Sequence, residues 1–98
     1  MIPRVRFHRM AAEELRGAIA YYESESTGLG EAFLHEIERC TETILDYPEA
    51  APIVSGSVRR RLTQRFPYAL IYSIRSTEIR ILAVMNLRRR PFYWTGRE

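Results

Sequence analysis

Two stretches of helical hydrophobic period follow one another with a short break between them, and they limit the fold more than any other feature. The first, residues 10–25, repeats apolar side chains at Leu15, Ala18, Ile19 and Tyr22. The second, residues 29–45, steps by three or four positions through Leu29, Phe33, Ile37, Cys40 and Ile44. The break holds Gly28 and Gly30, and glycine is a natural helix-end and turn residue. Helices joined so closely are predicted to pack as an antiparallel hairpin.

Alternating patterns indicate strands on both sides of this hairpin. Residues 2–7 place Pro3, Val5 and Phe7 on one side, and the proline favours an edge position or the entry to a strand. Residues 46–57, with two prolines and a glycine, predict a loop. Further strands are predicted at 58–63, 68–75 and 78–85, the last two as a β-hairpin. The last strand is apolar on both parities, so it should be central and buried on both faces.

The order of these elements predicts one α+β domain over residues 1–98. The apolar faces of the helices need a partner, and the strands provide it. We therefore expect a β-α-α-β-β-β fold in which the helical hairpin packs on a small antiparallel sheet.

Cysteine content and hydropathy predict a cytoplasmic location for the chain. Cys40 is the single cysteine, so no internal disulfide can form. No window approaches the roughly 20 apolar residues of a membrane span. The N-terminal arginines precede no apolar run, so we expect no secretory signal and no membrane association.

Charge is unevenly distributed along the chain. Residues 1–58 hold five arginines against ten acidic residues, a net −5, whereas residues 59–98 hold ten arginines against two, a net +8. This asymmetry favours an anionic partner for the second half, either nucleic acid or an acidic protein segment. Pairing between the two halves is the alternative. All 15 lysine or arginine positions are arginine, so no lysine can act as a general base or Schiff-base nucleophile. A GC-rich genome would produce the same residue usage without any functional meaning.

Two basic clusters are candidate binding sites. On a strand, Arg59 and Arg61 share a parity with Arg65, and their guanidinium groups can bind phosphate or carboxylate with two hydrogen bonds each. Arg60 falls on the opposite parity. The alternative is a solvated sheet face that discourages edge pairing.

The second cluster mixes cations with rings near the C-terminus. It comprises Arg88, Arg89, Arg90, Phe92, Tyr93, Trp94 and Arg97. Such a mixture suits single-stranded nucleic acid and suits an acidic, amphipathic peptide equally well. Alternatively, the aromatic residues cap the core.

Other chemistries find little support. One cysteine and the scattered His8 and His35 make no metal-ligand spacing, so neither a metal nor a cofactor is predicted. No phosphate loop or nucleophile motif is present. The glycines before the second helix could present N–H groups to an anion, but Glu25 and Glu31 oppose this.

Short fragments throughout the chain together resemble one family. In order, they are Tyr21-Tyr22-Glu23, Gly28-Leu29-Gly30, Phe33, Arg60, Phe66-Pro67-Tyr68, Ile71-Tyr72, Ile79, Ile81, Ala83-Val84, Arg89, Pro91, Tyr93-Trp94 and Arg97. They resemble the RelE/ParE superfamily of type II toxin–antitoxin toxins. The resemblance implies the fold above, growth arrest, and a hetero-oligomer with a cognate antitoxin, whose acidic or amphipathic segment would lie on the positive half.

The resemblance leaves the target open between two kinds of toxin. The glycine-containing helical hairpin is similar to ParE-like members, which poison DNA gyrase and are not enzymes. That interpretation assigns no catalytic residue. Its target-binding positions would be Arg60, Arg89, Tyr93, Trp94 and Arg97, with Arg59 and Arg61 beside them.

RelE-like members instead cleave mRNA on the ribosome. Here Arg61, Arg80 and Arg89 would bind the scissile phosphate, and Tyr93 would assist proton transfer. Two departures weaken this alternative: Asn86 stands where the family often has histidine, and the lysines of RelE-like enzymes are missing. A third hypothesis is an inactive module that only binds antitoxin or acts as a co-repressor.

Overall fold

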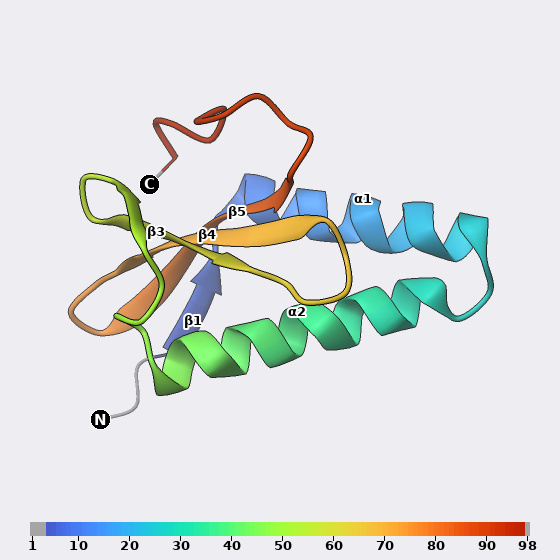
Figure 1. The fold of residues 1–98 in the computed structure, drawn as a ribbon, viewed down its shortest axis with the longest axis horizontal. Coiled ribbons are helices and arrows are strands. Elements are labelled where there is room, and N and C mark those ends of the chain that lie inside the picture. The colour runs from blue at the N-terminus through green and yellow to red at the C-terminus, as the bar shows by residue number, and fades with distance from the viewer. Residues whose placement is uncertain (1–3, 98) are drawn as a thin grey trace.

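The computed structural model describes residues 4–97, and the predicted role of Pro3 lies outside them. The elements are β1 (Arg4–Phe7), α1 (Arg9–Glu25), α2 (Leu29–Asp46), β2 (Ile53–Ser55), β3 (Val58–Leu62), β4 (Tyr68–Ile74) and β5 (Glu78–Asn86). The α+β fold class and the helical hairpin are therefore confirmed. Figure 1 shows α1 and α2 running side by side on one side of the sheet. Neither helix is long and apolar enough to cross a membrane.

The sheet differs from the expectation in two details. Its order is β1-β5-β4-β3-β2, and β1 runs parallel to β5, so the sheet is mixed rather than antiparallel. No tight turn links β1 to β5, so local sequence does not fix their relative direction. The second difference is β2, which lies inside the predicted loop. Gly56, at φ 56°, lets Ile53–Ser55 turn back onto β3, and three residues are too few to show alternation.

The connection between the helices is fixed by a carboxylate. Glu23 of α1 accepts hydrogen bonds from the backbone N–H groups of Gly28 and Gly30, at 3.0–3.1 Å. It thereby satisfies donors that the first turn of α2 leaves without partners. Gly28 has φ 89°, a left-handed conformation that favours glycine. A Cβ on Gly30 would lie 2.6 Å from the Ile19 carbonyl oxygen, so the two helices touch here.

The sheet carries an apolar cluster on each face. On the helix side, Phe33, Ile37 and Ile44 of α2 pack against buried side chains of β4 and β5 such as Leu70 and Ile81. The opposite face presents Ala69, Ile71, Leu82, Ala83 and Met85. As predicted, β5 is an interior strand, between β1 and β4, and it is buried on both faces. The second face therefore needs a cover that the helices cannot provide.

Candidate functional site

Residues 87–97, called the C-terminal tail below, cover the second face of the sheet. The tail turns at the end of β5, where Asn86 Oδ1 accepts from Arg88 N at 2.9 Å and Leu87 N donates to the Pro67 carbonyl at 2.9 Å. In Figure 1 the red tail then returns along the top of the sheet. Trp94, only 6% exposed, packs into the apolar cluster on this face. The alternative considered for the aromatic residues, that they cap the core, therefore describes Trp94.

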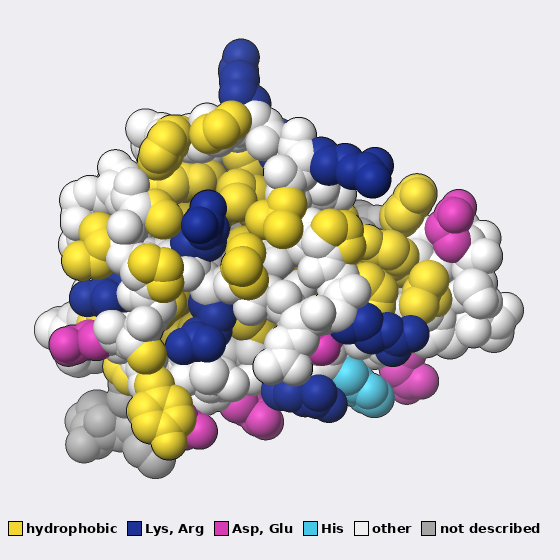
Figure 2. All heavy atoms as spheres, viewed as in Figure 1, with side chains coloured by type: hydrophobic (Ala, Val, Ile, Leu, Met, Phe, Trp, Pro, Cys, Tyr) yellow, Lys and Arg dark blue, Asp and Glu magenta, His cyan; other side chains and the backbone are white. Residues whose placement is uncertain are grey.

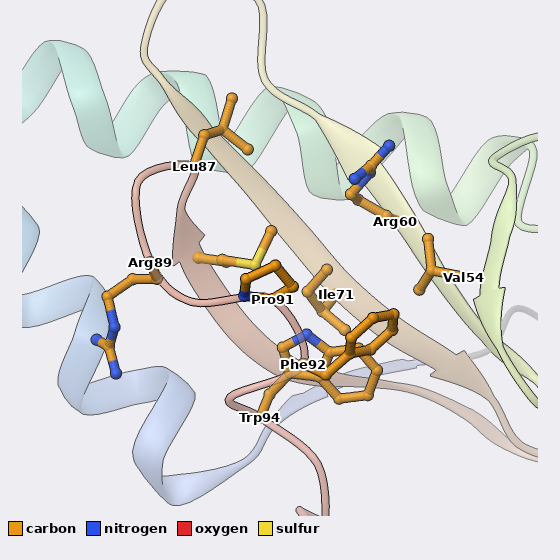
Figure 3. A pocket seen from close by; sticks show the side chains of 9 residues that line it. Val54, Arg60, Ile71, Leu87, Arg89, Pro91, Phe92 and Trp94 are labelled. Atoms are coloured by element: carbon orange, nitrogen blue, oxygen red, sulfur yellow. The ribbon is translucent and has the colours of Figure 1, made fainter.

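A groove of about 310 Å³ separates the tail from the strands. Its lining comprises Val54, Arg60, Ile71, Met85, Leu87, Arg89, Pro91, Phe92 and Trp94. Figure 3 shows Arg60 on β3 and Arg89 on the tail at opposite sides, with Ile71 between them. Both arginines are exposed. The groove thus combines an apolar floor with an arginine on each flank. The Arg89 guanidinium is directed away from the floor, toward α1, and stacks on the Tyr93 ring, 4.0 Å from its centre.

Exposed apolar groups extend the groove onto the surface. Phe92 is 51% exposed and Leu87 is 45% exposed. Phe92 also has φ 62°, a conformation that non-glycine residues rarely adopt and that stores about 1–3 kcal/mol. Figure 2 shows hydrophobic side chains gathered on this face of the molecule with arginines among them. A surface of this kind suits an amphipathic, acidic segment.

A carboxylate of α1 holds the far end of the tail. Glu14 accepts from the Tyr93 hydroxyl at 2.9 Å and from both terminal nitrogens of Arg97, at 3.1 and 3.0 Å. Arg97 Nη1 also donates to the Leu82 carbonyl at 3.0 Å. Burial and the bond to Glu14 raise the pKa of Tyr93 well above its usual value. We call Glu14, Tyr93 and Arg97 the Glu14 cluster.

The Glu14 cluster also completes an edge of the sheet. The last main-chain bond on the β1 side of β5 runs from His8 N to the Ile81 carbonyl. The β4–β5 register then shifts by one residue, leaving Leu82 without a partner on β4. Beyond it, Glu14 accepts from Val84 N at 3.0 Å, while Arg97 donates to the Leu82 carbonyl. Two side chains therefore occupy hydrogen-bonding positions that a neighbouring strand would otherwise take.

The structure divides the arginines of β3 between the two faces. Arg60 pairs in register with Ile71 and faces the groove. Arg59 and Arg61 share the opposite parity, as strand geometry requires, and this parity is the helix side. Arg59 Nη1 donates to the carbonyls of Glu49 and Ala51, at 2.9 and 2.7 Å. This division follows the predicted strand parity, and it leaves Arg60 as the arginine of β3 that lines the groove beside Ile71.

Arg61 is half-buried beside α2. It lines a small cavity of about 80 Å³ with Glu36 and Cys40, and its buried Nε has no hydrogen-bond partner among the described residues. Arg65, beyond the end of β3, places its guanidinium 5.3 Å from the centre of the Phe66 ring.

The four residues named for RNA cleavage lie in three environments. Arg61 lies beside α2, and Arg80 donates to Glu78 at 3.1 Å near the start of β5. Arg89 and Tyr93 do come together, with the guanidinium carbon 4.0 Å from the ring centre. The Tyr93 hydroxyl, however, donates to Glu14, and its raised pKa opposes loss of the proton.

Sequence reasoning assigned no site role to Glu14 or to Glu23, although Glu23 belongs to one of the fragments that carry the family resemblance. Glu14 lies three residues after Ala11 and four before Ala18, both buried, so it projects from the buried side of α1. An acidic residue between two small apolar ones at helical spacing was the available signal. Among residues 4–97, no group of three or more histidine, cysteine, aspartate or glutamate side chains could hold a metal ion.

Comparisons with known proteins identify the family. The family model described as the ParE toxin of the type II toxin–antitoxin system parDE matches residues 5–91. A chain in the solved structure of the chromosomal ParDE TA system from P. aeruginosa is 20% identical, with a TM-score of 0.70. The match covers 87% of this chain and 96% of that one. No curated protein gave a significant match. The chain belongs to the ParE toxin family of type II toxin–antitoxin systems.

Proposed function

We propose that this ParE-family chain arrests growth by binding DNA gyrase in the cytoplasm, and that a cognate antitoxin neutralises it. The observation that carries the proposal is the apolar groove flanked by Arg60 and Arg89. Arginine recognises carboxylates through paired hydrogen bonds, while the floor accepts an apolar side chain. This combination supports docking of a protein segment, both from the target and from an acidic or amphipathic region of the antitoxin.

The chemistry of the site supports docking over catalysis. Arginine remains protonated at accessible pH and cannot exchange a proton with a substrate. Tyr93 is held by Glu14, and Asn86 at the end of β5 accepts from the Arg88 N–H group. The arginine and aromatic residues of the tail and β3 that were predicted for target binding fall into two groups, one that lines the groove and one that attaches the tail. Arg60, Arg89 and Trp94 line the groove, while Tyr93 and Arg97 fix the tail behind it.

The proposal predicts trapped DNA breaks in a gyrase assay. Purified chain, free of antitoxin, is incubated with gyrase, ATP and plasmid, and protein is then stripped from the DNA. We expect linear plasmid that disappears when the cognate antitoxin is added. Arg60→Gln and Arg89→Gln should each need at least about tenfold more chain, corresponding to about 1.4 kcal/mol of binding. Arg16→Gln, the same change at an exposed position of α1, is the matched control.

Absence of linear plasmid with folded chain would contradict the gyrase target. Ribosome-dependent mRNA cleavage is the assay to run next, with Tyr93→Phe as the diagnostic variant. Absence of both activities, together with intact antitoxin binding, would leave the inactive-module hypothesis.

A further inference from the structure

The carboxylate of Glu14 accepts hydrogen bonds from two side chains in the far part of the C-terminal tail, Tyr93 and Arg97. We propose that Glu14 is a positioning residue: it holds the tail over the sheet and thereby builds one wall of the groove. Its consequence for activity rests on the proposed gyrase function. Its consequence for the position of the tail does not.

The hydrogen bonds of the tail support this role. Within residues 90–97, the described main-chain bonds are local: Tyr93 N to Arg90 O, Thr95 N to Phe92 O, and Arg97 N to Trp94 O. The described bonds that leave this stretch come from Tyr93 and Arg97, and they end on Glu14 or on the Leu82 carbonyl. Polar attachment of residues 90–97 to the rest of the domain is therefore concentrated at one side chain.

Burial makes the loss of either partner of this ion pair costly. The side chains of Arg97 and Glu14 are 8% and 17% exposed, with Nη2 and Oε2 3.0 Å apart. Removing one partner of a buried ion pair leaves an uncompensated charge, which is strongly destabilising. Arg97 would keep only the Leu82 carbonyl as a described acceptor. Moving the tail into water relieves that charge, so losing the carboxylate should free the tail.

The groove depends on the same contacts through neighbouring residues. Tyr93, bonded to Glu14, carries Arg89 against its ring at 4.0 Å and precedes Trp94 in the chain. Arg89 and Trp94 both line the groove, as do Pro91 and Phe92 of the tail. Glu14 does not line it. It acts through the residues that do.

The test compares Glu14→Gln with Glu13→Gln. Both remove one negative charge from α1, but among residues 4–97 Glu13 pairs only with Arg9, at an exposed position. Trp94, the single tryptophan, reports the tail directly. For Glu14→Gln we expect red-shifted emission and at least about twofold greater acrylamide quenching, with the helical circular dichroism retained. In the gyrase assay we expect at least a tenfold rise in the concentration required. Glu13→Gln should match the wild type in all three.

A double variant separates positioning from general destabilisation. Adding Arg97→Gln to Glu14→Gln removes the orphaned buried charge, so the double variant should quench less than Glu14→Gln alone. This non-additivity is expected only if the two side chains act as a pair. Equal or greater quenching in the double variant would overturn the proposal.

Two further outcomes decide the proposal. Wild-type emission and quenching in folded Glu14→Gln would overturn it. If the variants do not fold, the hydrogen exchange rate of the Val84 amide in the wild type tests the proposal instead. Glu14 accepts from this amide and should slow its exchange as much as a neighbouring strand would. Exchange at the rate of an unprotected amide would overturn the proposal. A shifted Trp94 signal with a wild type inactive on gyrase would uphold the positioning role while refuting the proposed function.

Discussion

Individual carboxylates in this chain differ sharply in what they contribute. Glu23 and Glu14 each accept from main-chain N–H groups, at the start of α2 and at the edge of β5. Glu13, one residue before Glu14, makes an exposed pair with Arg9, a contact generally worth under about 1 kcal/mol. Position on the helix, rather than residue type, therefore decides which acid organises the fold.

Cys40 gives a prediction for alkaline pH. Cys40 is 6% exposed, and burial raises the pKa of its thiol to about 11, whereas the pKa of a thiol in an unfolded chain is about 8.5. Because the folded-state pKa is the higher one, this contribution to stability is complete below pH about 8.5 and is lost as the pH rises toward 11. Urea unfolding of wild type and Cys40→Ala should therefore show a stability difference that narrows between pH 7 and 10. A constant difference would contradict the assignment.

The contact between α1 and α2 predicts opposite effects for two glycine substitutions. In Gly30→Ala the new Cβ would meet the Ile19 carbonyl at 2.6 Å, so the helices must separate; we expect a loss of about 1–3 kcal/mol. In Gly17→Ala nothing lies within 4 Å, and the gain in helix propensity should add up to about 1 kcal/mol. Chemical denaturation measures both. A loss of stability in Gly17→Ala as large as that in Gly30→Ala would show that packing is not the cause.

The same elements show what sequence patterns could and could not predict. Helices α1 and α2 carry their own hydrophobic period, and strands β3 to β5 are runs of strand-forming residues between turns. The sequence therefore predicted all five elements to within one residue. The parallel pairing of β1 and the three-residue β2 depend on contacts that no local pattern encodes.

The candidate site divides in the same way. The basic and aromatic character of the tail could be predicted from the sequence, and Arg60, Arg89 and Trp94 do line one groove. The Glu14–Arg97 pair spans 83 positions in the chain, so no sequence spacing could indicate it. Strand parity separated Arg59 and Arg61 from Arg60, but it could not say which face would meet the helices.

A buried ion pair links the acidic N-terminal half of the chain to the basic C-terminal half. Arg97 of the basic half pairs with Glu14 of the acidic half, whereas Arg60, Arg88, Arg89 and Arg90 remain exposed. Pairing between the halves, the alternative considered for the sequence, is thus realised in the Glu14 cluster. The exposed cations are left to attract an anionic partner from solution.

This arrangement predicts salt-dependent association with the cognate antitoxin. The Debye length falls from about 10 Å at 0.1 M to about 3 Å at 1 M, so the association rate should fall steeply over that range. Stopped-flow mixing measures the rate. Arg89→Gln should reduce the slope against salt, because it removes a charge from the groove, while dissociation changes less with salt. An association rate indifferent to salt would rule out electrostatic steering.

The unequal covering of the two sheet faces has a practical consequence. Two helices shield one face, whereas the other is shielded by a short tail with little regular structure, held by Trp94 and by the Glu14 cluster. Each time the tail dissociates from the sheet, the apolar side chains of Ile71, Leu82 and Met85 become exposed to solvent. Other copies of the chain can then associate with this apolar surface. We therefore expect the rate at which the isolated chain aggregates to depend on how often the tail opens. Any ligand that stabilises the closed tail should also slow aggregation.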